Sequence, residues 1–419
     1  MEPEPSTAAT ATPHASVHHD AVDCCIVGGG PAGAMLALLL ARQGLRVTLL
    51  EQHHDFDRDF RGDTLHPSVM EILDRIGLAE RVLALPHAEV REAVFSVEGR
   101  RFPIADFSRL PTRFPYILLV PQADFLPLIV EQARRCPGFE VRLGAAVRDL
   151  VVEDSVVRGV RYEVDRQRYE LRATLTVGAD GRFSTVRRRA GLEPERFAQM
   201  IDVLWFRVAR GANDAVMSLG RAGRGHVLAI LPRHDAWQLG WVFPKGSYQR
   251  LRAAGLPALR RELISLVPEL EDSIDSGLTD WSQVSLLSVE SSRVRRWHRP
   301  GLLLIGDAAH VMSPVGGVGI NYAIQDAVVA ANVLAEPLRQ GEVGTWPLVR
   351  VQLERALPTI VIQSLQNVLQ RRIFSTTSRG GFAIPGWFLR TPILRDLPAR
   401  IIAFGLWRVH PREVDREVA

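Results

Sequence analysis

Residues 22–51 read VDCCIVGGGPAGAMLALLLARQGLRVTLLE, and this stretch decides the fold. Its apolar runs predict a buried strand, a buried helix and a second buried strand, over residues 22–27, 31–43 and 45–50. Three glycines in GxGxxG spacing separate the first strand from the helix: Gly28, Gly30 and Gly33. Together these features predict the first unit of a doubly wound, Rossmann-like α/β sheet.

Each glycine meets a different steric demand of a dinucleotide-binding turn. Gly28 permits the tight turn, Gly30 lets the backbone approach a pyrophosphate, and Gly33 allows the helix to pack closely on the strand. The helix begins at Pro31 and Ala32, so its N-terminal amide groups face the phosphates.

The acidic residue Glu51 ends the second strand, near the spacing expected in such a turn. Its carboxylate accepts hydrogen bonds from ribose hydroxyls and repels a 2′-phosphate. The stretch therefore predicts a site for the ADP half of FAD or NAD, and not of NADP.

The composition is that of an ordinary globular protein. The chain has 419 residues, of which 47% are hydrophobic and 23% charged, and its mean hydropathy is +0.03. At about 150 residues per domain this length predicts two or three domains, and the composition excludes collagen, coiled coil and global disorder. Cys24 and Cys25 are adjacent and Cys136 stands alone, so we expect no metal site and a reducing, cytoplasmic location.

The net charge of +4 and the pI near 9.3 do not predict a nucleic-acid partner. Of the 51 Lys and Arg residues only Lys245 is a lysine, and the high pKa of arginine raises the pI without a basic surface. The arginines are scattered, without the interleaved aromatic residues of nucleic-acid-binding motifs.

No transmembrane segment is expected. Residues 24–41 are uncharged over the length of a membrane span, but Gly28, Gly29, Gly30 and Pro31 interrupt them and would break a helix in lipid. Residues 1–20 are predicted to form a disordered tail without the features of a signal peptide.

Two further motifs follow the first. Residues 177–181 read VGADG, and residues 301–326 read GLLLIGDAAHVMSPVGGVGINYAIQD. With the N-terminal GxGxxG, and in this order, they resemble the FAD-dependent aromatic hydroxylases, which are single-component flavoprotein monooxygenases of the para-hydroxybenzoate hydroxylase type. The resemblance covers roughly residues 22–370, and the third motif is the most specific.

The resemblance implies a set of residues around FAD. Asp307 bonds the ribityl chain, Pro314 lies beside the isoalloxazine, and the backbone that follows Pro314 faces the N1–C2 carbonyl side of the flavin. The turn also opens a predicted helix at 319–335, whose N-terminal amides favour an anion there. The complete expected set is Gly28, Gly30, Pro31, Ala32, Gly33, Glu51, Gln52, Arg61, Gln122, Val147, Asp180, Asp307, Pro314, Gly317, Val318, Gly319, Ile320 and Asn321. Asp180 is expected to act mainly on the fold around the cofactor, and the motif histidines His66 and His310 as structural residues.

The predicted architecture is α/β with α+β elements: a Rossmann-like FAD-binding domain, an inserted antiparallel β-sheet substrate domain and a C-terminal helical region. The FAD-binding domain is expected at 21–92, 115–198 and 285–345, the substrate domain at 93–114 and 199–284, and the helical region at 346–419. The apolar segment 382–407 also carries arginines, so a weak peripheral membrane contact is an alternative to its packing over the FAD domain. Its prolines Pro385, Pro392 and Pro398 argue against a long helix.

The resemblance implies one non-covalent FAD, reduced by transient NADH or NADPH and reoxidised by O2 through a flavin C4a-hydroperoxide that hydroxylates the substrate. The substrate is expected to be aromatic or polycyclic, and the arginine-rich composition indicates secondary metabolism. The protein is expected to be a monomer or a homodimer. A reductase of isoprenoid lipids, a flavin halogenase and an inactive flavin-binding homologue are the alternatives. The halogenase is disfavoured because the sequence 241–244 lacks the full tryptophan signature and Lys245, the only lysine, follows it.

No side chain is expected to be an indispensable acid or base, since the oxidised flavin adduct is itself the electrophile. Weak candidates for a minor role are His226, Tyr322 and Arg207. Aromatic residues between 200 and 243 are expected on strands that cover the flavin: Trp205, Phe206, Trp237, Trp241 and Phe243.

Overall fold

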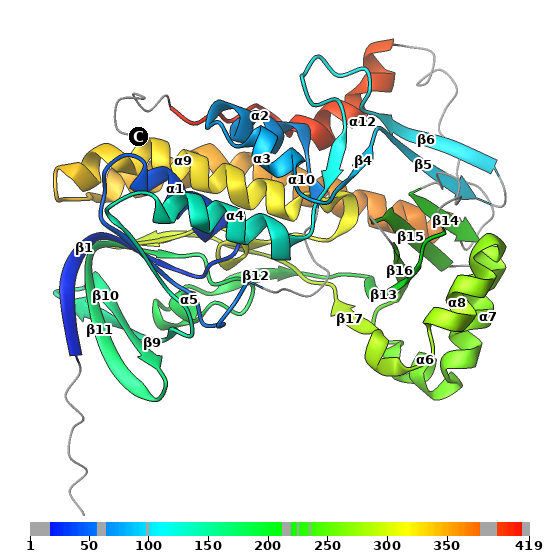
Figure 1. Cartoon of the computed structure of the whole chain (residues 1–419), viewed down its shortest axis with the longest axis horizontal. Helices are drawn as coiled ribbons and strands as arrows, with labels where there is room; N and C mark the ends of the chain where they lie inside the picture. The colour runs from blue at the N-terminus through cyan, green and yellow to red at the C-terminus, as the bar shows by residue number, and fades with distance from the viewer. Residues whose placement is uncertain are drawn as a thin grey trace, which may run out of the picture.

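The computed structural model describes residues 17–56, 64–97, 100–211, 219–223, 226–233, 236–377 and 392–412. The chain forms two bodies that lie side by side, each built on a large sheet (Figure 1). The predicted α/β class is confirmed. The boundaries of the predicted domains remain predictions.

The first body contains an eight-stranded sheet. Its main path runs β19 (His298–Arg299), β20 (Leu302–Leu304), β11 (Gln167–Gly178), β1 (Val17–Val27), β2 (Val47–Leu50) and β8 (Phe139–Arg142). The strands from β20 to β8 pair in parallel. The hairpin β9 (Ala146–Glu153) and β10 (Val156–Val164) pairs with β11 in antiparallel fashion.

Helices cover one face of this sheet. They are α1 (Pro31–Ala41), α4 (Gln122–Arg134) and α9 (Gly319–Arg339), with α1 packed against both of the others (Figure 1). Every residue of α1 from Ala32 to Ala41 is buried, which explains why this run carries no charge.

The predicted disordered tail is too long. The sequence suggests disorder through residue 20, whereas β1 begins at Val17 and pairs with β11 from Tyr169 onward. Backbone pairing with the edge of β11 forms this part of the strand, although its sequence lacks an apolar pattern. Residues 1–16 lie outside the described residues.

The second body contains a seven-stranded sheet. Its order is β17 (Ser285–Ser288), β13 (Ile201–Ala209), β16 (Ala236–Pro244), β15 (His226–Pro232), β14 (Gly220–Gly223), β5 (Glu92–Val97) and β6 (Arg100–Asp106). Among the described strands of this sheet, only β14 and β5 pair in parallel. The sheet thus takes strands from both segments that the sequence assigns to the substrate domain.

Three short helices pack on the outer face of the second sheet: α6 (Tyr248–Ala254), α7 (Leu256–Leu266) and α8 (Glu271–Gly277). The sequence suggests one helix over 248–272. Gly255 breaks it, because its φ of 86° is not helical, and a 3₁₀ turn at Pro268–Leu270 breaks it again.

Smaller elements connect the two bodies. One three-stranded sheet has the order β3 (Thr64–Leu65), β7 (Ile117–Leu119) and β4 (Ala88–Val90), and another has β12 (Pro194–Phe197), β18 (Ser291–Val294) and β21 (His310–Val311). The helices α2 (Pro67–Arg75) and α3 (Ala79–Leu83) lie near them, as do the 3₁₀ turns η3 (Gly306–Ala308) and η4 (Val315–Gly317). The helix α5 (Thr185–Arg189) packs against β9, and the 3₁₀ turn η2 (Trp281–Gln283) lies beside α6 on the outer face of the second sheet.

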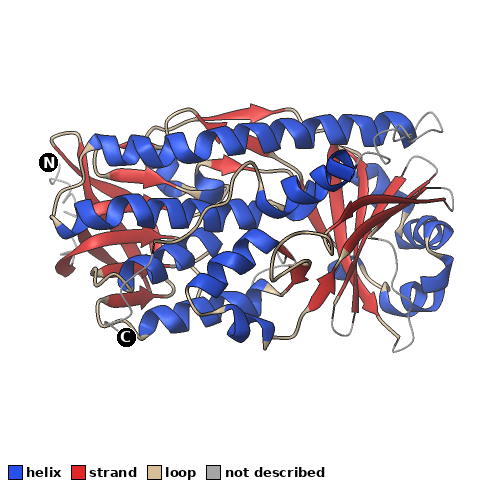
Figure 2. Cartoon of the chain, turned by 90° about the horizontal axis from the view of Figure 1, so that it is seen from above, coloured by secondary structure: helices blue, strands red, loops and turns tan. Residues whose placement is uncertain are grey.

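The long helix α10 (Thr345–Thr377) spans most of the length of the molecule and packs against α9 (Figure 2). The helix α12 (Pro392–Phe404) packs against β6 and α2. Contrary to the expectation from its prolines, α12 continues through Pro398.

One described helical segment, Val315–Arg339, is long and apolar enough to cross a membrane. Within its most apolar window 83% of the residues are buried inside the protein, where α9 packs on α1 and α10. The apolar character of this segment is therefore accounted for by its central position in the first body.

Candidate functional site

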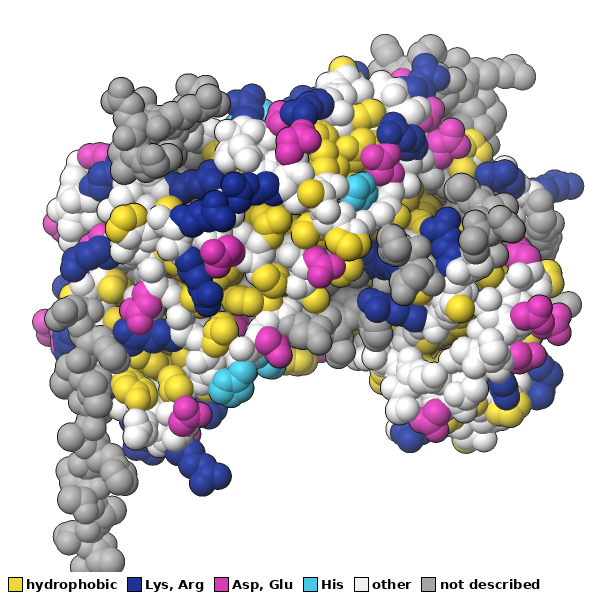
Figure 3. All heavy atoms as spheres, in the orientation of Figure 1, with side chains coloured by type: hydrophobic (Ala, Val, Ile, Leu, Met, Phe, Trp, Pro, Cys, Tyr) yellow, Lys and Arg dark blue, Asp and Glu magenta, His cyan; other side chains and the backbone are white. Residues whose placement is uncertain are grey.

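A single cavity of about 2390 Å³ extends from the glycine turn after β1 to the inner face of the second sheet. The notch between the two bodies is visible in Figure 3, where basic side chains are interspersed with acidic and apolar ones. Fourteen of the predicted cofactor-binding residues line this cavity: Gly28, Gly30, Pro31, Ala32, Glu51, Gln52, Gln122, Val147, Asp180, Asp307, Pro314, Gly317, Gly319 and Ile320. Residues far apart in the chain thus converge on one space.

The glycine turn has the geometry that its sequence predicts. Gly28 has a φ of 104°, and a Cβ there would lie 2.5 Å from the carbonyl oxygen of Ala179. A Cβ on Gly33 would lie 1.9 Å from the carbonyl oxygen of Gly28, so Gly33 permits close packing of α1, although it does not line the cavity. A Cβ on Gly30 would meet nothing within 4 Å. Gly30 therefore leaves open space in front of the helix.

The N-terminus of α1 opens into this space. Its N-cap residue Gly30 has no side chain that could cap the first amide groups, and the first turn of the helix contains no acidic residue. The first amide groups of the helix are thus available for an anion. This arrangement fits the pyrophosphate of the expected cofactor.

Glu51 lies buried beside the turn and is 4% exposed. Its Oε2 accepts a hydrogen bond from the amide of Gly29 at 2.7 Å, and its Oε1 accepts one from the amide of His53 at 2.9 Å. These two bonds fix the carboxylate beside the glycine turn.

Asp307 lies in η3, directly after β20, which pairs with β19 on one side and β11 on the other, and it lines the cavity. Gly306 before it has a φ of 59°, and the amide of Gly306 donates to Oδ2 of Asp326 at 3.0 Å. The turn that presents Asp307 is therefore held from behind by a residue of α9.

We expect Asp307→Ala to weaken FAD binding on the order of 10- to 100-fold, because it removes a charge-assisted hydrogen bond to a hydroxyl group. Titration of the apoprotein with FAD, followed by flavin fluorescence, measures the change. An unchanged dissociation constant contradicts the role assigned to Asp307.

The segment from Pro314 to Asn321 divides between the cavity and the protein interior. Val318 and Asn321 do not line the cavity. Asn321 is 2% exposed, accepts a hydrogen bond from the amide of His66 at 2.7 Å, and donates to the carbonyl oxygens of Thr64 and Gly317. Asn321 thus ties the glycine-rich turn to the start of α2, and its contact with a flavin remains a prediction.

Asp180 lines the cavity but also caps α5. Its Oδ2 accepts hydrogen bonds from the amides of Thr185 at 2.7 Å and Val186 at 3.0 Å, and its Oδ1 accepts one from the hydroxyl of Ser184. Burial raises the pKa of Asp180, against these hydrogen bonds, which lower it. The observed contacts agree with a structural role. Arg61 lies outside the described residues.

The three weak catalytic candidates do not gather at the cavity. His226 stacks on Trp241 and faces Glu262 of α7, on the opposite face of the second sheet, which argues against its proposed role. Arg207 is exposed and does not line the cavity. Tyr322 is 4% exposed, lies beneath the guanidinium of Arg355, and has a pKa raised to about 12 by burial, so it remains protonated at neutral pH.

Only one of the five predicted aromatic residues faces the cavity. Trp205 lines it together with Ile201 and Val203 from the same face of β13. The other four pack with α6, α7 and α8 on the outer face of the sheet: Phe206, Trp237, Trp241 and Phe243. Side chains alternate between the faces of a strand, so these four form core and not a roof over the flavin.

Helix α12 closes the cavity from another side through Leu397, Pro398, Ile401 and Ile402. The ring of His66 anchors its end, because Nδ1 lies 2.7 Å from the carbonyl oxygen of Ile402. Burial lowers the pKa of His66 to about 4, so the ring is neutral at pH 7 and donates to that carbonyl.

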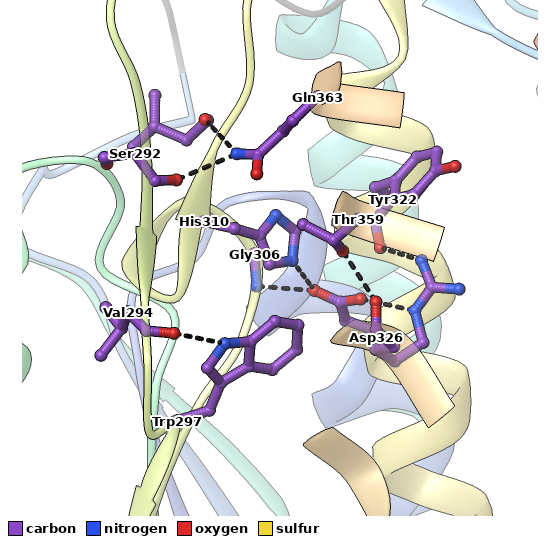
Figure 4. Close-up of polar contacts among 11 residues, drawn as sticks. Ser292, Val294, Trp297, Gly306, His310, Tyr322, Asp326, Thr359 and Gln363 are labelled. Carbon is purple, nitrogen blue, oxygen red and sulfur yellow. Dashed lines mark hydrogen bonds and ion pairs between the residues drawn. The ribbon is translucent and has the colours of Figure 1, made fainter. Parts of the chain in front are cut away.

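Sequence reasoning missed a buried charge network behind the cofactor turns (Figure 4). Asp326 of α9 is 0% exposed. Its Oδ2 accepts from Nε2 of His310 at 2.6 Å, and its Oδ1 accepts from Nε of Arg355 at 2.7 Å. The sequence signal was an acidic residue within an apolar helix. The network joins α9, α10 and the η3 turn.

Comparisons with known proteins agree with this geometry. The family described as FAD binding domain matches residues 21–355. A 6-methylpretetramide 4-monooxygenase of Streptomyces rimosus is 40% identical over 390 residues, which cover 91% of this chain and 92% of that protein. The OxyS anhydrotetracycline hydroxylase from Streptomyces rimosus matches with a TM-score of 0.73 at 26% identity, covering 92% of this chain and 76% of that one. The flavin-dependent brominase Bmp2 matches with a TM-score of 0.76 at 20% identity over 92% of this chain and 94% of that one, which shows the fold alone.

Proposed function

The chain belongs to the family of FAD-dependent aromatic hydroxylases, and on that premise we propose that it hydroxylates a polycyclic phenol of the 6-methylpretetramide kind, with NADH or NADPH and O2 as cosubstrates. One observation carries the proposal: a continuous cavity joins the dinucleotide turn to an apolar chamber under the second sheet. A cofactor and a polycyclic substrate can therefore meet in one space. A cytoplasmic location belongs to this proposal.

Bound FAD supplies the two-electron reduction and the activation of oxygen, and the chain supplies the binding and orientation. The amides at the N-terminus of α1 hold the pyrophosphate, and Glu51 holds the ribose. Gly317 and Gly319 line the cavity at the start of α9, whose first turn also contains no acidic residue. The positive end of this helix dipole would favour negative charge on a cofactor bound there.

The second half of the cavity has a largely apolar wall on the side of the second sheet. Its walls carry apolar side chains from β13, β15, β16 and β17: Ile201, Val203, Trp205, Val227, Ala229, Leu231, Val242 and Leu287. These apolar side chains would limit the access of water to the reacting part of a bound cofactor. The same walls bury the rings of an aromatic substrate by the hydrophobic effect.

The position of Lys245 does not support the halogenase alternative. Its Nζ donates to Oδ1 of Asp202 at 2.9 Å and to the carbonyl oxygen of Val289 at 2.8 Å, and it does not line the cavity. These contacts make Lys245 a structural residue at the end of β16. It is not placed to carry an oxidised halogen to a substrate.

The proposal is tested with the FAD-loaded protein, NADH or NADPH, and 6-methylpretetramide. We expect substrate-dependent oxygen consumption and a product that carries one oxygen atom derived from ¹⁸O2. No turnover of the substrate is expected under anaerobic conditions. Anaerobic conversion of the substrate would support the reductase alternative, and a halogenated product in chloride or bromide would support the halogenase.

A further inference from the structure

The buried face of α10 carries a row of polar side chains, which is unusual for a helix packed on a core. The row follows helical spacing and consists of Arg355, Thr359, Gln363, Gln366 and Gln370, each at most 3% exposed. Burial of these polar side chains lowers the stability of the fold unless they form hydrogen bonds. Their partners show what the row does.

Two of these glutamines hold the segment that leads into the flavin turn. Nε2 of Gln363 donates to the carbonyl oxygens of Ser292 and Val311, both at 3.0 Å (Figure 4). Nε2 of Gln366 donates to the carbonyl oxygens of Ser313 at 2.8 Å and Val315 at 2.7 Å. The helix thus fixes the backbone on both sides of Pro314.

Gln370, the last member of the row, lines the cavity together with Ser313. Its Nε2 donates to Oγ of Ser313 at 2.6 Å and to Oε1 of Gln199 at 3.1 Å, which uses both amide protons. Within the described part of the chain, no residue donates to Oε1 of Gln370. Because Gln370 lines the cavity, this oxygen lies at the cavity wall.

The hydroxyl of Ser313 complements that acceptor. Its Oγ accepts from Gln370 and, at 3.4 Å, from the amide of Val315, while its own proton has no acceptor among the described residues. The surrounding wall of the cavity is apolar: Met312, Pro314, Val315, Leu365 and Leu369. A donor and an acceptor therefore stand side by side in an apolar wall, next to the proline expected beside the isoalloxazine.

We propose that Ser313 and Gln370 form a hydrogen-bonding subsite for a phenolic hydroxyl of the substrate. The phenol donates its proton to Oε1 of Gln370 and accepts the proton of Ser313. This pairing satisfies both protein groups and orients the ring at the edge of the flavin turn. The inference rests on the proposed function and deepens it, since it names the substrate group that is recognised.

The test measures binding to the oxidised, FAD-loaded protein by equilibrium dialysis, with 2-hydroxyanthraquinone and anthraquinone as matched probes. We expect the wild type to bind the hydroxylated probe about 10-fold more tightly, as one well-placed hydrogen bond predicts. Gln370→Leu and Ser313→Ala should each reduce this preference to about 2-fold or less. Ser364→Ala, which removes an exposed hydroxyl of the same helix, should leave it unchanged.

Equal binding of the two probes by the wild type, binding of neither probe, or a full preference in Ser313→Ala overturns the subsite. If Gln370→Leu does not fold or retain FAD, Ser313→Ala decides, because it removes a single oxygen. A preserved preference without turnover of 6-methylpretetramide would refute the proposed function and leave the subsite standing. Turnover without any preference would refute the subsite alone.

Discussion

Gly30→Val is expected to yield a folded protein that has lost FAD, with affinity reduced on the order of 100-fold or more. The backbone of Gly30 has a φ of −71° and a ψ of −177°, which any residue adopts, and a Cβ there meets no atom within 4 Å. The fold therefore tolerates the valine. Its side chain instead occupies the space that the pyrophosphate must enter at the N-terminus of α1.

Gly33→Val provides the matched control within the same turn. A Cβ at Gly33 lies 1.9 Å from the carbonyl oxygen of Gly28, so the backbone must shift and the protein itself should be destabilised. Circular dichroism and thermal unfolding of the apoproteins separate the two cases. Retention of FAD by Gly30→Val at wild-type occupancy, measured by the ratio of flavin to protein absorbance, contradicts the assignment of the turn.

The glycine turn was predictable because its steric demands are local. Gly28, Gly30 and Gly33 lie within a few residues of one strand and one helix, so their spacing alone predicts the geometry of the turn. The local pattern of apolar residues also predicts a helix over residues 122–134, and α4 has these bounds.

The orientation of the aromatic residues follows from the sequence, and the predicted roof over the flavin conflicts with it. On β16 the large residues Trp237, Leu239, Trp241 and Phe243 recur with a period of two, which places them on one face of a strand. Gly240 lies on the other face, where a Cβ would lie 2.7 Å from the ring of Trp205. The alternation distinguishes the core face from the cavity face.

The polar network around Asp326 and the glutamine row of α10 were not predictable. Both depend on how α10 packs against α9 and the segment 311–315. The spacing of residues within one element does not predict which side chains of distant elements come into contact. A buried acid within an apolar helix indicates that a partner exists, but Arg355 is one arginine among fifty.

Asp326→Asn is expected to lower the free energy of unfolding by about 3–5 kcal/mol, the range for breaking a buried ion pair. Asp326 and Arg355 are both 0% exposed, so the substitution leaves a buried guanidinium without its counter-ion. In the wild type the backbone amide of Gly306 donates to Asp326, and in the variant the NH2 group of asparagine can face this amide, so that two donors meet. Because this bond holds the turn of Asp307, FAD affinity should fall as well.

Urea unfolding at pH 7 measures the loss of stability. Glu354→Gln is the control on α10, since it breaks an exposed pair with Arg350 and should change the free energy of unfolding by about 0.5 kcal/mol or less. A loss below about 1 kcal/mol for Asp326→Asn would show that the network does not stabilise the fold.

The pH dependence gives the same expectation a second test. Burial by itself raises the pKa of Asp326, but His310 and Arg355 outweigh it and hold the pKa below its ordinary value. A carboxyl whose pKa is lowered on folding stabilises the folded state above its unfolded pKa of about 4, and this stability is lost as the pH falls through the lower, folded value. A protonated Asp326 resembles asparagine. The difference in stability between the wild type and Asp326→Asn should therefore be constant from pH 5 to pH 7 and shrink below about pH 4, whereas a difference that persists unchanged in acid would assign the loss to packing and not to charge.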